Sequence, residues 1–66
     1  MTVTVNGEPR EVPSGTTVAQ VIATLSSKPS GIAAAVNGEV VPRGGWGVRA
    51  LRDRDQVEIV TAVQGG

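Results

Sequence analysis

Two residue types that are central to much nucleophilic, acid–base and metal chemistry are absent from this sequence. None of its 66 residues is a cysteine or a histidine, which excludes Ser–His–Asp triads, Cys–His pairs, HExxH motifs and thiolate zinc sites. Four features could still carry chemistry: two aspartates near residue 54, a glycine-rich run, a group of arginines and the final two glycines. We expect no resident metal and no permanently bound cofactor.

The aspartates and the glycine-rich run are better explained as turns. Asp53 and Asp55 alternate with Arg52 and Arg54, a pattern typical of a solvated turn rather than of a metal site or a catalytic acid pair. The run RGGWG at residues 43–47 lacks the Gly-Lys-Ser/Thr ending of a phosphate-binding loop. Since glycine is the usual turn residue, this run predicts an ordinary turn.

Four arginines in the second half of the chain form the third candidate. Together they could make a weak docking patch for an acidic partner, although a solvated surface is the simpler interpretation. The arginines concerned are Arg43, Arg49, Arg52 and Arg54.

The fourth candidate is the end of the sequence, VTAVQGG (residues 60–66). Glycines have no Cβ atom, so such a segment can enter a narrow channel and leave the carboxyl carbon of Gly66 open to attack. A frayed terminus without function is the alternative interpretation. If the terminal carboxylate is the reactive group, the protein is a carrier and not an enzyme, because its partners supply the catalysis.

Charge and hydropathy narrow the choice of partners. Six basic and six acidic residues balance, and without a basic stripe and interleaved aromatic residues we do not expect nucleic-acid binding. The apolar runs are far shorter than the roughly 20 residues of a membrane span, and the start of the chain lacks the features of a secretory signal. We therefore expect a soluble cytoplasmic domain over residues 1–66, with residues 62–66 as an extended tail.

The first quarter of the chain predicts a β-hairpin. Val3 to Val5 alternates apolar and polar residues as a half-buried strand does. Asn6-Gly7 follows, and both residues tolerate the positive φ of a type I′ turn. The return strand should run from Glu8 to Val12, with Pro9 confining it to a sheet edge.

A helix should follow the hairpin. Thr17 and Gln20 have the spacing of a capping box, in which each side chain accepts a hydrogen bond from a free backbone N–H. Pro29 disfavours helical geometry in the residue before it, so the helix should end near Ser26. The spacing of the apolar residues predicts one buried stripe. Its members are Val18, Val21, Ile22 and Leu25.

The second half of the chain predicts three further strands. VNGE occurs at residues 5–8 and again at 36–39, so a second hairpin should join strand 32–36 to a short strand at Val40-Val41. The connection from Pro42 to Gln56 should lie on the surface. The last strand should span residues 57–61. The connection should be anchored by three apolar side chains, Trp46, Val48 and Leu51.

This order of elements predicts an α+β fold of the β-grasp type. One helix has one apolar face, and a single mixed sheet of four to five strands gives that face a surface to cover. The β-branched last strand suits a central position beside the first strand.

The assembled residues resemble the ThiS-type sulfur carrier proteins of thiamine thiazole synthesis, which have the ubiquitin-like β-grasp fold and a flexible C-terminal diglycine tail. The likeness covers nearly the whole chain. It rests on SGTTV (14–18) at the helix entry, AAVNGEVVPR (34–43) followed by Trp46, and DRDQVEIVTAVQGG (53–66). Each segment alone is weak, but all three in this order make a strong match.

The resemblance implies a reaction cycle and its partners. An E1-like enzyme would adenylate the Gly66 carboxylate with MgATP. A sulfur donor, a cysteine desulfurase or another persulfide protein, would convert it to a thiocarboxylate that thiazole synthase receives. Gly65 and Gly66 are thus the activation site. Four further residues would contact the partners, and these are Val60, Ala62, Val63 and Gln64.

One position departs from the family pattern. The family usually has Asp-Gly-Asp before the last strand, whereas this chain has Arg54 in the middle. If the backbone there requires a positive φ, arginine costs about 1–2 kcal/mol.

Three alternatives remain open on sequence alone. The small subunit of molybdopterin synthase would share the fold and the diglycine. A ubiquitin-like modifier would share the activation but join its carboxylate to lysines of target proteins. A binding module with an inert tail would use neither glycine.

Overall fold

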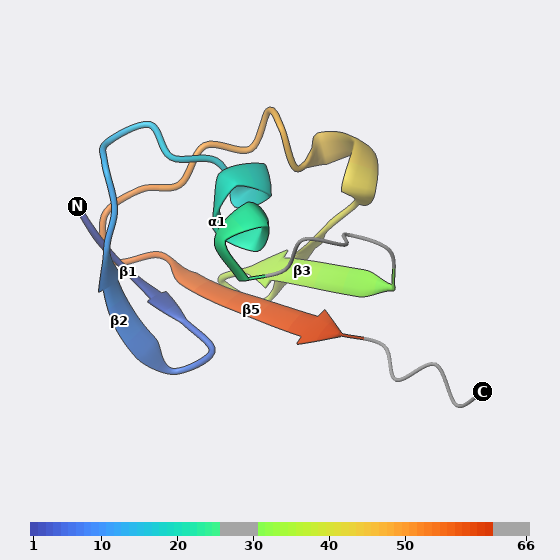
Figure 1. Cartoon of the computed structure of the whole chain (residues 1–66), viewed down its shortest axis with the longest axis horizontal. Helices are drawn as coiled ribbons and strands as arrows, with labels where there is room; N and C mark the ends of the chain where they lie inside the picture. Colours follow the sequence, from blue (N-terminus) through green and yellow to red (C-terminus); the bar gives the residue numbers. More distant parts are fainter. Residues whose placement is uncertain (26–30, 62–66) are drawn as a thin grey trace.

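The structure is a computed structural model that describes residues 1–25 and 31–61. It contains five strands, one α-helix and one short 3-10 helix (Figure 1). In chain order these are β1 (Thr2–Val5), β2 (Glu8–Glu11), α1 (Val18–Leu25), β3 (Ile32–Val36), β4 (Glu39–Val41), η1 (Arg43–Gly45) and β5 (Gln56–Thr61).

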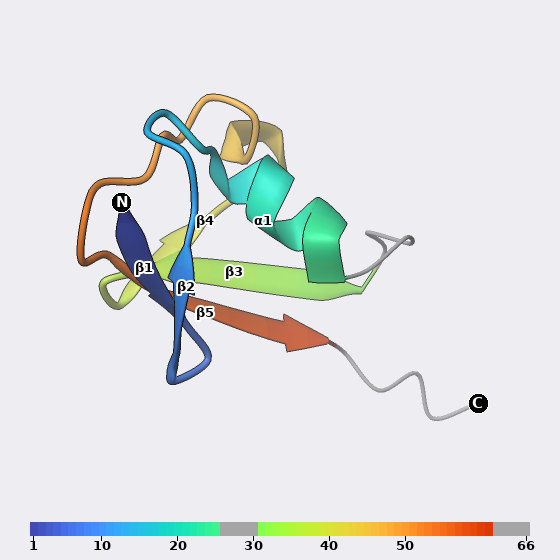
Figure 2. The same cartoon turned by 60° about the vertical axis from the view of Figure 1, so that its left-hand side comes forward.

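The five strands form one mixed sheet in the order β2-β1-β5-β3-β4. Strand β1 runs parallel to β5, and the other neighbouring pairs are antiparallel. Helix α1 and η1 lie on the same side of the sheet (Figure 2). The structure therefore confirms the β-grasp prediction, with five strands and with the last strand central beside the first.

Both Asn-Gly pairs form the predicted hairpin turns. The φ angles are 50° and 83° at Asn6 and Gly7, and 52° and 83° at Asn37 and Gly38. Positive φ at both central residues is the mark of a type I′ turn, which asparagine and glycine tolerate best. Pro9 lies in β2, at the edge of the sheet, where the missing N–H does no harm.

The helix begins with the predicted capping box. The backbone N–H of Thr17 donates to Gln20 Oε1 at 2.8 Å, and the N–H of Gln20 donates to Thr17 Oγ1 at 3.3 Å. Val18, Val21 and Ile22 are buried as predicted. Leu25, the fourth member of the predicted stripe, is 40% exposed and so is only partly covered.

The core lies between α1 and the inner face of the sheet. Its buried apolar residues are Val3, Val5, Val18, Val21, Ile22, Ala34, Val36, Val41, Trp46, Leu51 and Val57. The indole N–H of Trp46 donates to the Val41 carbonyl at 2.9 Å, so the one polar atom of this ring is satisfied.

Two of the three predicted anchors of the long connection are correct. Trp46 and Leu51 are buried, but Val48 is 84% exposed and anchors nothing. The N–H groups of Val48 and Arg49 both donate to the Gly45 carbonyl, which holds Val48 in a tight turn directly after the buried indole. Trp46 and Leu51 occupy the core-facing positions on either side, so Val48 projects into solvent.

Candidate partner-binding site around the last strand

Strand β5 leads into the segment that the sequence singles out, and it is held on both sides. On one side Thr4 and Val5 of β1 pair with Gln56 and Val57. On the other side all of β3 pairs with it, from Val36 opposite Val57 to Ile32 opposite Thr61. Strand β1 stops at Val5, so β5 needs another partner on that side beyond Val57.

Asn6 supplies that partner with its side chain. Its Oδ1 accepts a hydrogen bond from the Ile59 N–H at 2.8 Å, and its Nδ2 donates to the Ile59 carbonyl at 3.1 Å. The amide thereby satisfies both backbone groups of Ile59 on the β1 side. The ladder on the β1 side thus continues to Ile59, two residues before the end of β5.

Asn37 holds the other end of the strand. Its Oδ1 accepts from the Gln56 N–H at 2.9 Å, and its backbone N–H donates to the Gln56 carbonyl at 2.7 Å. Its Nδ2 donates to Asp55 Oδ1 at 3.0 Å. The two VNGE turns therefore fix β5 at its first residue and near its exit.

The turn before β5 has a positive φ at the position where the Asp-Gly-Asp pattern has glycine. Arg54 has φ 71°, so the position does require a left-handed backbone and arginine carries the expected strain. The turn is held by hydrogen bonds from the Arg54 N–H to the Thr2 carbonyl at 2.6 Å and from the Thr2 N–H to Asp53 Oδ1 at 2.8 Å. Asp53 and Asp55 act here as turn acceptors.

The outer face of the sheet, opposite α1, carries an apolar groove beside β5. Its volume is about 150 Å³, and its lining includes Ala33, Ala35, Val40 and Val60, with Glu58 among them. Strand pairing places Val40 beside Ala35 and Ala33 beside Val60. Val40 is 72% exposed and Val60 is 61% exposed, so two valines lie open to solvent beside residues 58–60 of the sheet. We call this surface the outer-face groove.

The sequence identified Val60 but missed the residues beside it. The signal was the alternation in Val40-Val41: Val41 is buried in the core, so Val40 must point to the opposite face. The predicted tail residues, Ala62 to Gly66, lie outside the described residues.

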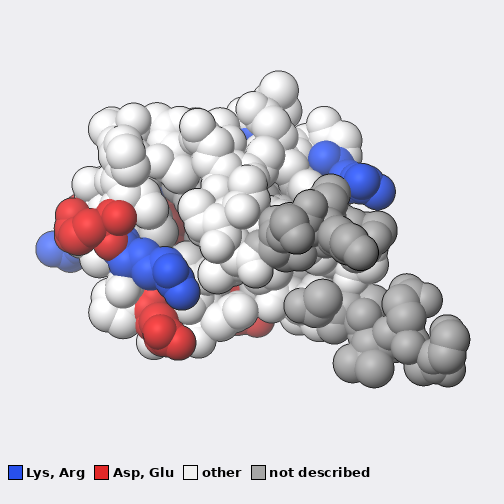
Figure 3. All heavy atoms as spheres, viewed as in Figure 1, with Lys and Arg blue, Asp and Glu red and all other residues white. Residues whose placement is uncertain are grey.

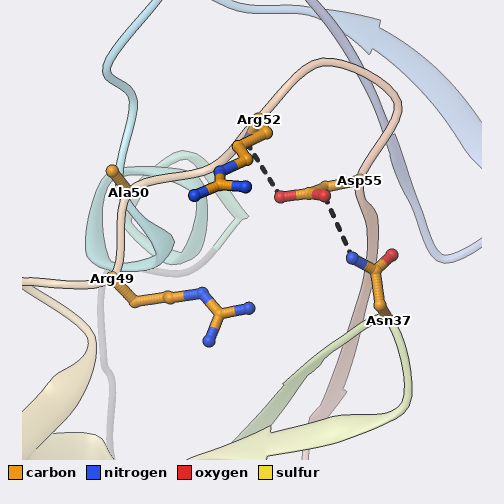
Figure 4. A pocket seen from close by; sticks show the side chains of 5 residues that line it. All are labelled: Asn37, Arg49, Ala50, Arg52 and Asp55. Atoms are coloured by element: carbon orange, nitrogen blue, oxygen red, sulfur yellow. Dashed lines mark hydrogen bonds between the residues drawn. The ribbon is translucent and has the colours of Figure 1, made fainter.

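Only two of the four predicted patch arginines lie together. Arg49 and Arg52 line a hollow of about 470 Å³ with Asn37, Ala50 and Asp55 (Figure 4). Arg43 lies in η1, and Arg54, whose side chain is 91% exposed, pairs weakly with Asp53 at 4.0 Å.

On the face of the molecule drawn in Figure 3 the charges are mixed. The face seen in Figure 3 has acidic and basic groups side by side near the N-terminal hairpin and a largely uncharged centre. In the described part of the chain, no three Asp or Glu residues come together as a metal would require. Within residues 1–25 and 31–61, no helix has the length and apolar character that a bilayer crossing requires.

Comparison with known proteins gives a consistent result along the full chain. The ThiS family model matches residues 3–66. The chain belongs to the ThiS family. Over all 66 residues it is 29% identical to the sulfur carrier protein ThiS of Escherichia coli K12, with both chains fully covered. It is 36% identical to a stretch of a thiazole synthase of Magnetococcus marinus, and it spans only 20% of the length of that protein.

Solved structures of another ThiS protein share this fold. The crystal structure of the thiamine biosynthesis protein ThiS from Geobacter metallireducens matches with a TM-score of 0.83 at 29% identity, over the full length of both chains. An NMR solution structure of a thiamine biosynthesis protein from the same organism matches with a TM-score of 0.80, covering 88% of that chain. The fold in which β5 is the central strand therefore matches structures that were determined by experiment.

Proposed function

We propose that this chain is a sulfur carrier protein of thiamine biosynthesis whose reactive group is the C-terminal carboxylate of Gly66. The observation that carries the proposal is the match of the ThiS family over residues 3–66, which runs through both terminal glycines. The similarity to the sulfur carrier protein of Escherichia coli over the full length of both chains supports the same function.

In the proposed chemistry the Gly66 carboxylate is first adenylated and then converted to a thiocarboxylate. An E1-like enzyme lets the Gly66 carboxylate attack the α-phosphorus of MgATP, which releases pyrophosphate and leaves an acyl adenylate. The terminal sulfur of a persulfide donor, carried by a cysteine desulfurase or a similar protein, then attacks the acyl carbon and AMP leaves. A thiol cleaves the remaining S–S bond and frees the thiocarboxylate.

Thiazole synthase is the proposed acceptor of the sulfur. A stretch similar to this whole chain makes up a fifth of a thiazole synthase of Magnetococcus marinus, which supports a close functional link between carrier and synthase. The carrier contributes no catalytic side chain of its own and acts as a co-substrate.

The outer-face groove is the proposed docking surface next to the tail, with Val60 in it. We expect Ala62, Val63 and Gln64 to enter the partner's channel ahead of Gly65 and Gly66. Replacing Val60 with glutamine should raise the KM for the carrier roughly fivefold, because about 1 kcal/mol of apolar burial is lost. Val48→Gln is the control, since that valine is also exposed, at 84% against 61% for Val60, but lies outside the groove.

The decisive experiment is an intact-mass measurement. The protein is incubated with the E1-like enzyme, MgATP and a sulfur source, beside a variant that lacks Gly66. A mass gain equal to one sulfur replacing one oxygen, absent from the variant, supports the carrier. An unchanged mass, with an enzyme that modifies another carrier, contradicts it.

The acceptor is then tested separately. Incubation of the thiocarboxylate form with thiazole synthase and with molybdopterin synthase should give sulfur transfer to the first alone. Transfer only to the second would assign the chain to the molybdopterin pathway, and isopeptide adducts without a thiocarboxylate would indicate a protein modifier.

A further inference from the structure

The hollow lined by Arg49 and Arg52 lies by the start of β5, at the opposite end of that strand from Thr61. Asn37 and Asp55, on its other wall, adjoin Gln56 at the start of β5. Thr61, after which the tail begins in the sequence, lies at the other end of the strand, about 17 Å from Gln56 at the usual rise per residue. A partner that holds the tail and also contacts the hollow therefore grips both ends of β5.

The carboxylate in this hollow is engaged in hydrogen bonds, whereas the two guanidinium groups have donors left free by the described part of the chain. Asp55 is already occupied, because its Oδ2 accepts from the Arg52 backbone N–H at 2.8 Å and its Oδ1 accepts from Asn37 at 3.0 Å. Neither guanidinium forms an ion pair with Asp55 within the described residues. The two arginine side chains extend into the same space (Figure 4).

The arginine donors are mostly unused. Arg49 makes one contact, from Nη1 to Glu39 Oε1 at 3.2 Å, and the Glu39 side chain is 74% exposed. The Arg52 guanidinium has no hydrogen-bond or ion-pair partner among residues 1–25 and 31–61. Each guanidinium offers five N–H donors in a planar fork that matches a carboxylate.

We propose that this hollow is a docking point for an aspartate or glutamate side chain of the adenylating enzyme; the inference rests on the proposed function. Glu39 and Asp55 balance the two guanidinium charges in number, but Glu39 occupies only one nitrogen of Arg49 and Asp55 is engaged by Asn37 and the Arg52 N–H. The Arg52 guanidinium and the remaining donors of Arg49 are therefore open to an acidic side chain. The acceptor synthase can distinguish a loaded carrier by its terminal sulfur. The adenylating enzyme meets a plain diglycine end, so it has to recognise its carrier by the folded domain.

The test compares Arg49→Gln, Arg52→Gln and the double variant with the wild type in ATP–pyrophosphate exchange. Arg10→Gln, on the edge strand β2, is the matched control. The KM for the carrier should rise about threefold to tenfold in the double variant, as for two partly exposed ion pairs, with little change in kcat. The difference from wild type should shrink at high salt, because exposed charges are screened.

An unchanged KM in the double variant, or an equal rise in Arg10→Gln, would overturn the inference. An effect confined to sulfur transfer by thiazole synthase would overturn the assignment to the adenylating enzyme. Wild-type protein that supports no exchange would contradict the proposed function instead. In that case the hollow is tested directly, by titrating hexaglutamate into isotope-labelled protein and recording NMR spectra. The amide signals of Ala50 and Arg52 should shift in the wild type and not in the double variant. The absence of a shift in the wild type would overturn the inference.

Discussion

The two Val-Asn-Gly-Glu turns have the same sequence and nearly the same backbone, yet they hold different parts of β5. Asn6 binds Ile59 with its side chain, whereas Asn37 binds Gln56 and Asp55. Their φ angles differ by only 2°, so turn geometry does not explain the difference.

Strand direction explains it. Val5 and Val36 both pair with Val57, one from each side. Because β1 runs parallel to β5, the residue after Val5 lies toward the exit of β5. Because β3 runs antiparallel, the residue after Val36 lies toward its start. One turn sequence thus fixes two ends of a strand when it follows strands of opposite direction.

The largest expected effect comes from Asn37→Ala. It removes two side-chain hydrogen bonds, one of them to the charged Asp55, and adds strain at a positive φ, for a loss of about 3 kcal/mol in the free energy of unfolding. Urea denaturation measures this. Asn37→Gly is the control without the backbone strain and should lose about 2 kcal/mol; a loss below about 1 kcal/mol in either variant would contradict a clamp at this end.

Asn6→Ala should cost less, about 2 kcal/mol, because neither of its hydrogen bonds involves a charged group. Its effect should also be local. The exchange rate of the Ile59 amide should rise more than that of the Val60 amide. The Ile59 N–H donates to the Asn6 side chain, whereas Val60 is paired with Ala33 of β3. Equal acceleration at both amides would mean that Asn6 stabilises the whole domain rather than the exit of β5.

Gly7→Ala and Gly38→Ala should lower the free energy of unfolding by the same amount. Both glycines have φ 83°, and a Cβ at either position would meet nothing within 4 Å. Each substitution should therefore cost only the left-handed strain, about 1–2 kcal/mol, and by the same amount in urea denaturation. Costs that differ by more than about 0.5 kcal/mol would show that the two turns are not equivalent in backbone energy.

The smallest effect is expected at Arg54, the third non-glycine residue with a positive φ. Unlike asparagine, arginine has no short amide that compensates locally. Arg54→Gly should raise the free energy of unfolding by about 1 kcal/mol. Arg54→Ala removes the charge but keeps the Cβ and should give no gain, so stabilisation by alanine would assign the effect to charge instead of strain.

Features encoded over short distances in the sequence were predictable. The Asn-Gly turns, the capping box of Thr17 and Gln20, and the edge position of Pro9 each depend on neighbouring residues, and all three are confirmed. The role of Asn6 was not predictable, because its partner lies 53 residues away and the contact exists only once the sheet order is known.

The wrong predictions have a related cause. The apolar character of Val48 predicts an anchor, but the turn around Gly45 directs this side chain outward. The closeness of the four arginines in sequence allows a single patch as the less simple of two interpretations, whereas the fold brings only Arg49 and Arg52 of the four to one hollow. In both cases side-chain direction within an irregular connection decides, and residue type alone does not encode it.

The central position of β5 has a consequence for how the molecule comes into being. Without it the β1–β2 and β3–β4 hairpins share no strand pairing, so a growing polypeptide cannot close its sheet until residues 56–61 have been synthesised. A topology rich in distant contacts also folds slowly. A chain broken off early in translation would remain two loose hairpins, and the protein that does fold has already acquired the strand leading to its last residues.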